Sequence, residues 1–221
     1  MIKGAIFDLD GTILDSMFIW DTIGESYLRS LGIEPKEDLK KTFETFSLEQ
    51  AAHYYREHYQ VTLSIEEIIN GVNDMVARYY TDMVPLKPCV NDFLLKLKKQ
   101  GIRMCIATAT ERKLAEAALK RCKVRKLFSE IFTCTQAGKS KESPDIYRAA
   151  QRHLGTEKKE TIVFEDAVHA LYTAKADGFV TTAVYDIHEE NQEKMKAISD
   201  FYIKDFSEVD VILKLLFTVD F

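Results

Sequence analysis

Short apolar runs recur along the chain, and amphipathic segments with helical spacing separate most of them. The runs that predict strands cover residues 2–7, 102–108, 131–134, 161–164 and 179–184, with a weaker run at 201–203. Helices are predicted between them, around residues 93–97, 114–119, 145–155 and 167–176, with a last, weaker helix at 209–217. Repeated strand, helix and strand units predict an α/β fold, a Rossmann-like doubly wound parallel sheet with helices on both faces.

The segment from Asp15 to Val84 departs from this pattern, because it shows helical spacing and almost no strand signal. Apolar residues at 20–31, 48–55 and 65–79 each indicate one face of a helix. Ser64 and Glu67 have the spacing of a capping box at the start of the last of these helices. We therefore expect an all-helical domain at 15–84, inserted into an α/β core formed by residues 1–14 and 85–221.

Composition and charge narrow the class of protein. The chain has 221 residues, of which 46% are hydrophobic, and a formal net charge of −5. Such a chain can bury a sizeable core, but it lacks the basic balance that nucleic acid or an anionic membrane would require, so neither is an expected partner. No apolar stretch reaches the length of a membrane span, and the residues before Asp8 are too few for a signal segment.

The four cysteines are widely spaced and include no C-x-x-C pair. This spacing favours neither a zinc site nor a disulfide framework, so we expect a reducing compartment and a cytoplasmic protein. A monomer is the default expectation for the oligomeric state.

Polar side chains gather where three of the predicted strands end. In a doubly wound sheet the carboxyl ends of the central strands form the ligand-binding edge. The residues expected there are Asp8 with Asp10, Thr108 with Thr110, and Glu165 with Asp166, while Lys141 precedes a neighbouring helix. Several carboxylates at one edge repel one another unless a cation neutralises them, and a hard divalent ion with oxygen ligands, most simply Mg²⁺, would do so.

Four segments, in this order, resemble the motifs of the haloacid dehalogenase superfamily, and the resemblance covers the whole chain. They are Asp8-Leu9-Asp10-Gly11-Thr12, Thr108 after its strand, Lys141-Glu142-Ser143-Pro144-Asp145-Ile146-Tyr147, and Val163-Phe164-Glu165-Asp166-Ala167. A lone D-x-D is weak, because Asp and Gly also serve ordinary turns, but the ordered set is specific. The subgroup with a helical cap, which includes phosphatases and β-phosphoglucomutases, keeps that cap where residues 15–84 lie.

The resemblance implies roles for the residues at the strand ends. Asp8 would be the nucleophile that forms an aspartyl-phosphate, and Asp10 the general acid and base. Thr12 would support the position of Asp10, with Thr110 as a further supporting residue. Thr108 and Lys141 would bind the phosphoryl oxygens.

The same resemblance implies a Mg²⁺ site formed by Asp8, Asp10 through its carbonyl, and Asp166. Glu165 would join it directly or through water, and both alternatives stay open here. Lys139, two residues before Lys141, is an alternative cation, although the spacing to Pro144-Asp145 favours Lys141.

The family contains several chemistries. Asp10 argues against a dehalogenase, which has no leaving oxygen to protonate. A hexose-phosphate mutase similar to β-phosphoglucomutase is the alternative, but such enzymes typically hold the second phosphate with an arginine in a G-x-S-R segment of the cap. Leu48 stands at that position in Thr45-Phe46-Ser47-Leu48-Glu49. We therefore expect a phosphatase acting on a small phosphorylated metabolite, whose identity no motif in the insert names.

Overall fold

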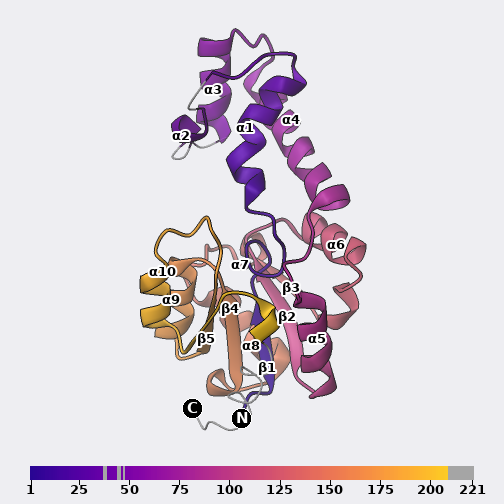
Figure 1. The fold of residues 1–221 in the computed structure, drawn as a ribbon, viewed down its shortest axis with the longest axis vertical. Helices are drawn as coiled ribbons and strands as arrows, with labels where there is room; N and C mark the ends of the chain where they lie inside the picture. The colour runs from indigo at the N-terminus through magenta and orange to yellow at the C-terminus, as the bar shows by residue number, and fades with distance from the viewer. Residues whose placement is uncertain (37–38, 44–45, 47, 209–221) are drawn as a thin grey trace. The chain divides into compact units, whose positions relative to one another are not determined.

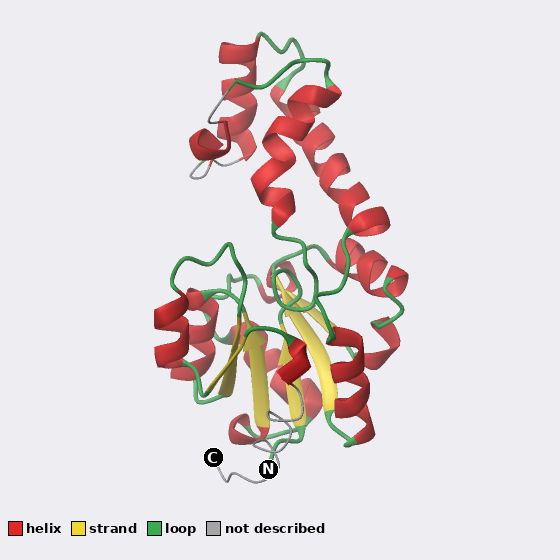
Figure 2. Ribbon diagram, viewed as in Figure 1, coloured by secondary structure: helices red, strands yellow, loops and turns green. Residues whose placement is uncertain are grey.

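The computed structural model describes residues 1–36, 39–43, 46 and 48–208, and these form two compact units. One unit, the core, comprises Met1–Ser16 and the described residues from Val84 onward; the other, the helical unit, is Met17–Met83. The helix expected at 209–217 lies outside the described residues. Figure 1 shows the labelled elements of each unit, and Figure 2 shows that the strands belong to the core.

A six-stranded sheet, parallel throughout, forms the centre of the core, in the order β3-β2-β1-β4-β5-β6. The expected doubly wound parallel sheet is confirmed. The strands are β1 (Gly4–Phe7), β2 (Arg103–Thr108), β3 (Ile131–Thr133), β4 (Thr161–Glu165), β5 (Val180–Val184) and β6 (Phe201–Ile203). From β1 the chain adds β2 and β3 on one side of the sheet and then β4, β5 and β6 on the other side. The carboxyl ends of β1, β2 and β4 therefore lie together at the topological switch point.

The two faces of the sheet are built from alternate residues of the same strands. Ile6, Cys105 and Val163 face a cluster that includes Tyr147 and Ala150 of α8 (Asp145–Leu154). Phe7 and Phe164 stack with ring centroids 4.5 Å apart and contact Phe93 of α5 (Val90–Lys99), which also packs on Phe206. Because both faces are covered, the strands read as continuous apolar runs.

The described residues of the core form four further helices: α6 (Arg112–Arg121), α7 (Cys134–Ala137), α9 (Val168–Ala176) and α10 (Gln192–Ile198). Single turns of 3₁₀-helix lie at Arg125–Leu127, Lys158–Glu160 and Phe206–Glu208. The strand expected at 131–134 ends at Thr133, because the Thr133 hydroxyl accepts the Gln136 N–H, 3.2 Å away, and begins α7. The four cysteines are all free.

The helical unit contains α1 (Phe18–Ser30), α2 (Leu39–Phe43), α3 (Leu48–Tyr59), α4 (Ile65–Arg78) and a π-helical turn at Tyr79–Met83. Its core is aromatic: Tyr55 packs on Tyr27 and Phe43, and its hydroxyl donates to the Gly24 carbonyl, 2.8 Å away. The expected capping box of Ser64 and Glu67 is present at the start of α4. The assignment of this unit as a cap stays a prediction.

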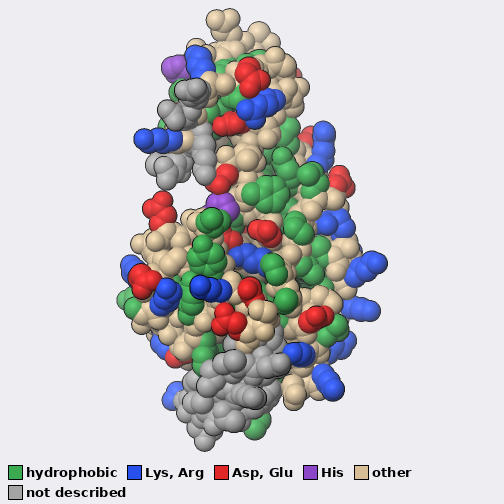
Figure 3. Space-filling model, in the orientation of Figure 1, with side chains coloured by type: hydrophobic (Ala, Val, Ile, Leu, Met, Phe, Trp, Pro, Cys, Tyr) green, Lys and Arg blue, Asp and Glu red, His purple; other side chains and the backbone are tan. Residues whose placement is uncertain are grey.

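Acidic and basic side chains are interspersed on the face shown in Figure 3 rather than gathered by sign. None of the helices in the described part of the chain is long and apolar enough to cross a membrane.

Candidate active site

The loop that follows β1 is shaped by a glycine. Asp8 continues the ladder of β1 by donating its N–H to the Phe164 carbonyl of β4, 3.0 Å away. Gly11 has φ of +74°, a left-handed conformation that disfavours residues with a Cβ. A Cβ built on Gly11 would lie 2.1 Å from Asp166 Oδ2. Position 11 therefore requires glycine for two reasons: the turn, and the close approach of the loop to Asp166.

Three carboxylates meet at the carboxyl ends of β1 and β4. Asp8, Glu165 and Asp166 are all buried, and each has an oxygen within 4.8 Å of the oxygens of the other two. The parallel register of β1 and β4 causes this convergence, because Phe7 pairs with Phe164 and the next residue of each strand is acidic. Sequence reasoning placed these residues together, and the structure brings them together.

Lys141 reaches this cluster from the loop before α8. Its Nζ forms an ion pair with Asp8 Oδ1 and a second, 2.7 Å long, with Glu165 Oε1. Burial by itself lowers the pKa of the Lys141 ammonium, but Asp8 and Glu165 outweigh burial and raise it, so the side chain is cationic. Lys139 instead pairs with the half-buried Asp145, 3.0 Å away, so of the two lysines Lys141 is the one that contacts the carboxylates of the cluster.

Tyr147 and Lys141 together fix Glu165. The buried Tyr147 hydroxyl donates to Glu165 Oε1 at 2.7 Å, the same oxygen that Lys141 contacts. Glu165 Oε2 is buried and has no hydrogen-bond partner. An unpartnered carboxylate oxygen in a buried site is costly unless a cation lies against it.

This donor set fits a hard divalent cation. Carboxylate oxygens are the ligands that Mg²⁺ prefers, and one Glu165 oxygen needs a partner. The three carboxylates also exceed the single ammonium of Lys141 by two charges, which is the charge of one divalent ion. Asp8, Glu165 and Asp166 could therefore hold a metal ion.

The pKa values of the clustered carboxyl groups show that burial and mutual repulsion disfavour their charged forms, and a cation would reduce both effects. Burial, followed by repulsion from Asp8, raises the pKa of Glu165, and the opposing effects of Lys141 and Tyr147 do not cancel it. Burial and the charges of Asp8 and Glu165 likewise raise the pKa of Asp166 well above its usual range. Both shifts are those expected of like charges gathered in a buried site whose single ammonium neutralises only part of the negative charge.

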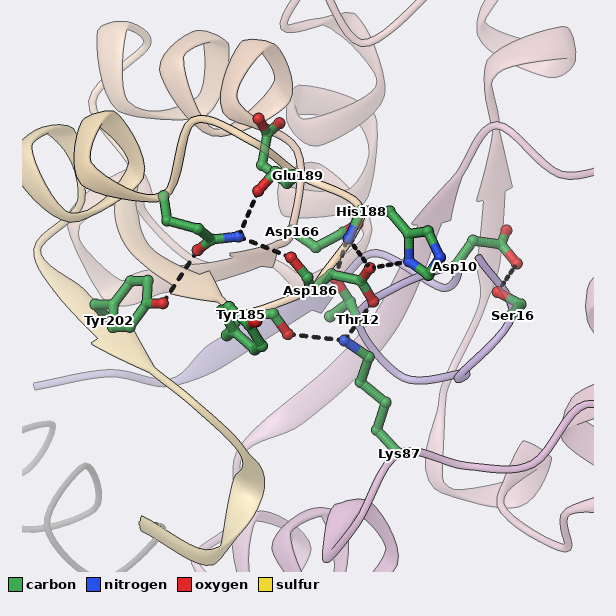
Figure 4. Close-up of polar contacts among 11 residues, drawn as sticks. Asp10, Thr12, Ser16, Lys87, Asp166, Tyr185, Asp186, His188, Glu189 and Tyr202 are labelled. Carbon is green, nitrogen blue, oxygen red and sulfur yellow. Dashed lines mark hydrogen bonds and ion pairs between the residues drawn. The ribbon is translucent and has the colours of Figure 1, made fainter. Parts of the chain in front are cut away.

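Asp10 lies beyond this cluster and is held by two hydroxyl groups. Ser16 Oγ donates to Asp10 Oδ1 at 2.7 Å, and Thr110 Oγ1 donates to Oδ2 at 2.6 Å. Figure 4 shows the Asp10 carboxylate pointing toward Ser16. Thr110, which was expected to be a supporting residue, thus contacts Asp10, and so does Ser16, which sequence reasoning missed.

The resemblance implied that Thr12 supports Asp10, and the structure places its hydroxyl against Asp166. The Thr12 hydroxyl donates its one proton to Asp166 Oδ1, 3.0 Å away, as the dashed line in Figure 4 shows. The left-handed turn at Gly11 accounts for this, because it directs the chain after Asp10 back against the loop that carries Asp166. The hydroxyl of Thr12 therefore orients a candidate metal ligand, Asp166.

Thr108, at the end of β2, is buried and accepts a hydrogen bond from the Thr110 N–H, 3.0 Å away. Because this contact uses an acceptor site of the hydroxyl, the Thr108 proton can be donated to another oxygen. Such a donor is what a bound oxyanion requires.

A second polar group missed by sequence reasoning lies in the loop after β5. Lys87, Asp186 and His188 form a chain of ion pairs there, with 2.7 Å between Lys87 Nζ and Asp186 Oδ2 and 2.7 Å between His188 Nδ1 and Asp186 Oδ1 (Figure 4). The position of the loop, directly after the apolar strand 179–184, was the signal that could have drawn attention to these residues.

The core thus defines a class: a parallel α/β domain whose switch point carries clustered carboxylates and a buried lysine. The chain matches the haloacid dehalogenase-like hydrolase family over residues 5–184. The protein therefore belongs to the haloacid dehalogenase-like hydrolases, and the family resemblance seen in its motifs is confirmed.

The chain is also similar to named proteins and to a solved structure. The chain is 27% identical to protein CbbY of Cereibacter sphaeroides over 203 residues, which cover 86% of this chain and 88% of that protein. It is 24% identical to the phosphorylated carbohydrates phosphatase of Thermotoga maritima over 177 residues, covering 80% and 82% of the two chains. The crystal structure of CbbY from Rhodobacter sphaeroides in complex with phosphate is 24% identical, with a TM-score of 0.73 and coverage of 95% and 96%.

Proposed function

We propose that the protein is a Mg²⁺-dependent phosphatase that releases phosphate from a small phosphorylated metabolite through an aspartyl-phosphate on Asp8. The observation that carries this proposal is the buried group of Asp8, Glu165, Asp166 and Lys141. It joins a carboxylate nucleophile to the cations that an anionic substrate needs. The name of the Thermotoga maritima relative supports a phosphorylated carbohydrate as the substrate class.

In the first step Asp8 attacks phosphorus and the bond to the leaving oxygen breaks. Lys141, already held by Asp8 and Glu165, neutralises the phosphoryl oxygens, and Thr108 donates its hydroxyl proton to one of them. A bound Mg²⁺ would supply further positive charge at the same oxygens, held by Asp8, Asp166, Glu165 and the Asp10 carbonyl.

Asp10 moves the proton in both steps. It gives a proton to the leaving oxygen, and then, as a carboxylate, it takes one from the water that attacks the phosphorylated Asp8. Ser16 and Thr110 fix both of its oxygens, so the carboxyl group keeps one orientation through the two transfers.

The helical unit, Met17–Met83, is proposed as the cap that contributes substrate specificity. Leu48, the first residue of α3, provides no cation for a second phosphate. This is why we prefer a phosphatase to a hexose-phosphate mutase. Arg56 and Arg78 are exposed cations of the same unit and keep the mutase as the alternative.

The test is to measure phosphate release and isomerisation in the same samples. The protein is incubated with Mg²⁺ and a panel of phosphorylated sugars, polyols and nucleotides, with β-glucose 1-phosphate and a trace of the 1,6-bisphosphate included. We expect Mg²⁺-dependent phosphate release from at least one monophosphate, and none from Asp8→Asn. Rapid formation of glucose 6-phosphate with little free phosphate would favour the mutase instead.

A further inference from the structure

The stretch of chain just before the helical unit pairs with the stretch just after it, and the paired residues of both belong to the core. Asp15 donates its N–H to the Pro85 carbonyl, 3.0 Å away, and Lys87 donates its N–H to the Ile13 carbonyl, 2.9 Å away. The two stretches therefore form a short antiparallel ladder. We call its second stretch, residues 84–87, the return segment.

This ladder sets the position of Ser16, which contacts the proposed acid and base. Ser16 directly follows Asp15 of the ladder, is buried, and donates its hydroxyl to Asp10 Oδ1 at 2.7 Å (Figure 4). The turn after Asp10 closes on the same stretch, because Gly11 donates its N–H to the Leu14 carbonyl, 2.9 Å away. A shift of the return segment would therefore be transmitted to the Asp10 carboxyl group.

Both ends of the return segment are attached to other parts of the core. At one end, Arg121 Nη2 at the end of α6 donates to the Val84 carbonyl. At the other end, Lys87 Nζ pairs with Asp186 Oδ2 at 2.7 Å and donates to the Tyr185 carbonyl at 2.8 Å (Figure 4). The second attachment depends on the side chain of Lys87.

The ion pair of Lys87 and Asp186 is largely shielded from solvent, with 12% of the lysine side chain and 4% of the aspartate side chain exposed. His188 donates its backbone N–H to Asp186 Oδ1 at 3.0 Å. Burial raises the pKa of Asp186, but Lys87 and the His188 N–H lower it overall, so the group is a carboxylate. Because water screens buried charges little, and an unpaired buried charge is costly, the two groups hold each other firmly.

The loop that carries Asp186 is itself fixed against the chain that carries the candidate metal ligands. It follows β5, which pairs with β4 in parallel. Glu189 Oε2 accepts the Val168 N–H, 3.0 Å away, and Val168 begins α9 two residues after Asp166. Lys87 thus connects the ladder to the loop that lies against the metal-ligand segment.

We propose that Lys87 is a positioning residue for proton transfer: paired with Asp186, it fixes the ladder and hence the Asp10 carboxyl group relative to the carboxylates of the candidate site. The inference rests on the proposed function, in which Asp10 protonates the leaving oxygen. In this role Lys87 acts through the ladder and Ser16, and touches neither the substrate nor the reacting atoms. A proton donor must lie within hydrogen-bond reach of the leaving oxygen, so its displacement costs most when that oxygen is basic.

The experiment compares p-nitrophenyl phosphate with phenyl phosphate at saturating Mg²⁺. Phenol is the more basic leaving group and needs protonation more, so the ratio of kcat/KM for phenyl phosphate to that for p-nitrophenyl phosphate reports on proton donation by Asp10. We expect this ratio to fall about fivefold in Lys87→Met, further in Asp10→Asn, and to recover in Lys87→Arg, which keeps the charge. A loss of folded enzyme alone lowers both kcat/KM values equally and leaves the ratio unchanged.

Lys175→Met is the matched control, because Lys175 also joins two segments of the core by pairing with an aspartate, Asp200. Asp200 contacts the N–H of Thr181 near the amino end of β5, at the opposite end of the strand from the loop that carries Asp186. The ratio should therefore keep its wild-type value in Lys175→Met.

The double variant Lys87→Met with Asp186→Asn tests the same role without leaving an unpaired charge in the buried site, in case the single variant does not fold. Its ratio should also fall. A wild-type ratio in the folded Lys87 variants, while Asp10→Asn lowers it, would overturn the positioning role of Lys87. An unchanged ratio in Asp10→Asn, or no hydrolysis of either phosphate by the wild type, would instead overturn the proposed function.

Discussion

At the scale of single residues, one ammonium group and one hydroxyl group hold the carboxylates of the site in place. Lys141 contacts Asp8 and Glu165 at once, and Tyr147 contacts the Glu165 oxygen that Lys141 uses. The other Glu165 oxygen is buried and has no hydrogen-bond partner. This arrangement favours direct ligation of a metal by Glu165, which the sequence left open.

Replacing Tyr147 with Phe removes one hydroxyl from the environment of Glu165. We expect Mg²⁺ affinity to fall about tenfold, because groups that orient a metal ligand typically contribute that much. Isothermal titration calorimetry with Mg²⁺ measures it, with Tyr172→Phe as the control, since Tyr172 is 61% exposed on α9. Equal affinity in Tyr147→Phe and wild type would show that Lys141 alone orients Glu165.

Asp10→Asn separates proton transfer from nucleophilic attack. Sugar phosphates have poor leaving groups and need a proton from Asp10, so phosphate release should fall by about 10²-fold or more. Formation of the phosphoenzyme from p-nitrophenyl phosphate, whose leaving group needs less help, should fall much less. Stopped-flow release of nitrophenol provides the measurement. An equal loss for both substrate types would remove Asp10 from the acid and base role.

At the scale of elements, the strands and their ends were predictable, whereas the loops between them were not. The apolar run before Asp8 and the run before Glu165 predicted strands whose parallel pairing brings these carboxylates together. The partner of Thr12 could not be predicted, since it depends on the conformation of the turn at Gly11. Residues 192–198 form α10 although Met195 is the one buried residue among them, so their pattern was too weak to indicate a helix.

Gly11→Ala tests the close approach of the turn to Asp166. The new Cβ would lie 2.1 Å from Asp166 Oδ2, so the carboxylate must move. Gly101 is the matched control, because its φ of +78° resembles that of Gly11 and a Cβ there meets nothing within 4 Å. Both variants should lose about 1–2 kcal/mol of unfolding free energy from the left-handed conformation. Only Gly11→Ala should also lose Mg²⁺ binding, measured by calorimetry, and turnover, measured by phosphate release. Retention of both in Gly11→Ala would refute the steric argument.

At the scale of the whole molecule, the carboxylate cluster links stability to metal and pH. The pKa of Glu165 is raised to about 7 in the folded protein, and that of Asp166 is raised as well. Carboxyl groups with raised pKa bind protons more tightly in the folded state than in the unfolded state. Their contribution to stability is therefore gained as pH falls through about 7 and lost as pH rises through it.

Mg²⁺ competes with these protons, so its effect on the melting temperature should depend on pH. At pH 8.5, Mg²⁺ at about a hundred times its Kd should raise Tm by roughly 5–10 °C. The increase should shrink as pH falls through about 7, the pKa of Glu165, and be nearly absent at pH 5. Differential scanning fluorimetry from pH 5 to 8.5 measures it, with Asp166→Asn as the variant that should show little Mg²⁺ effect at any pH. An increase in Tm that is constant over this range would contradict proton competition at the cluster.

The most direct measurement is the chemical identification of the phosphorylated residue. Asp10→Asn is mixed with Mg²⁺ and a ³²P-labelled aryl phosphate, quenched in acid, digested, and its peptides are mapped by mass spectrometry. Because this variant is impaired in activating water, the phosphoenzyme should accumulate, and the account predicts an acid-stable, hydroxylamine-sensitive acyl phosphate on Asp8. The same experiment on Asp8→Asn with Asp10→Asn should give no label. Label on another residue, or turnover of the wild type with no phosphoenzyme in any variant, would contradict the proposed mechanism.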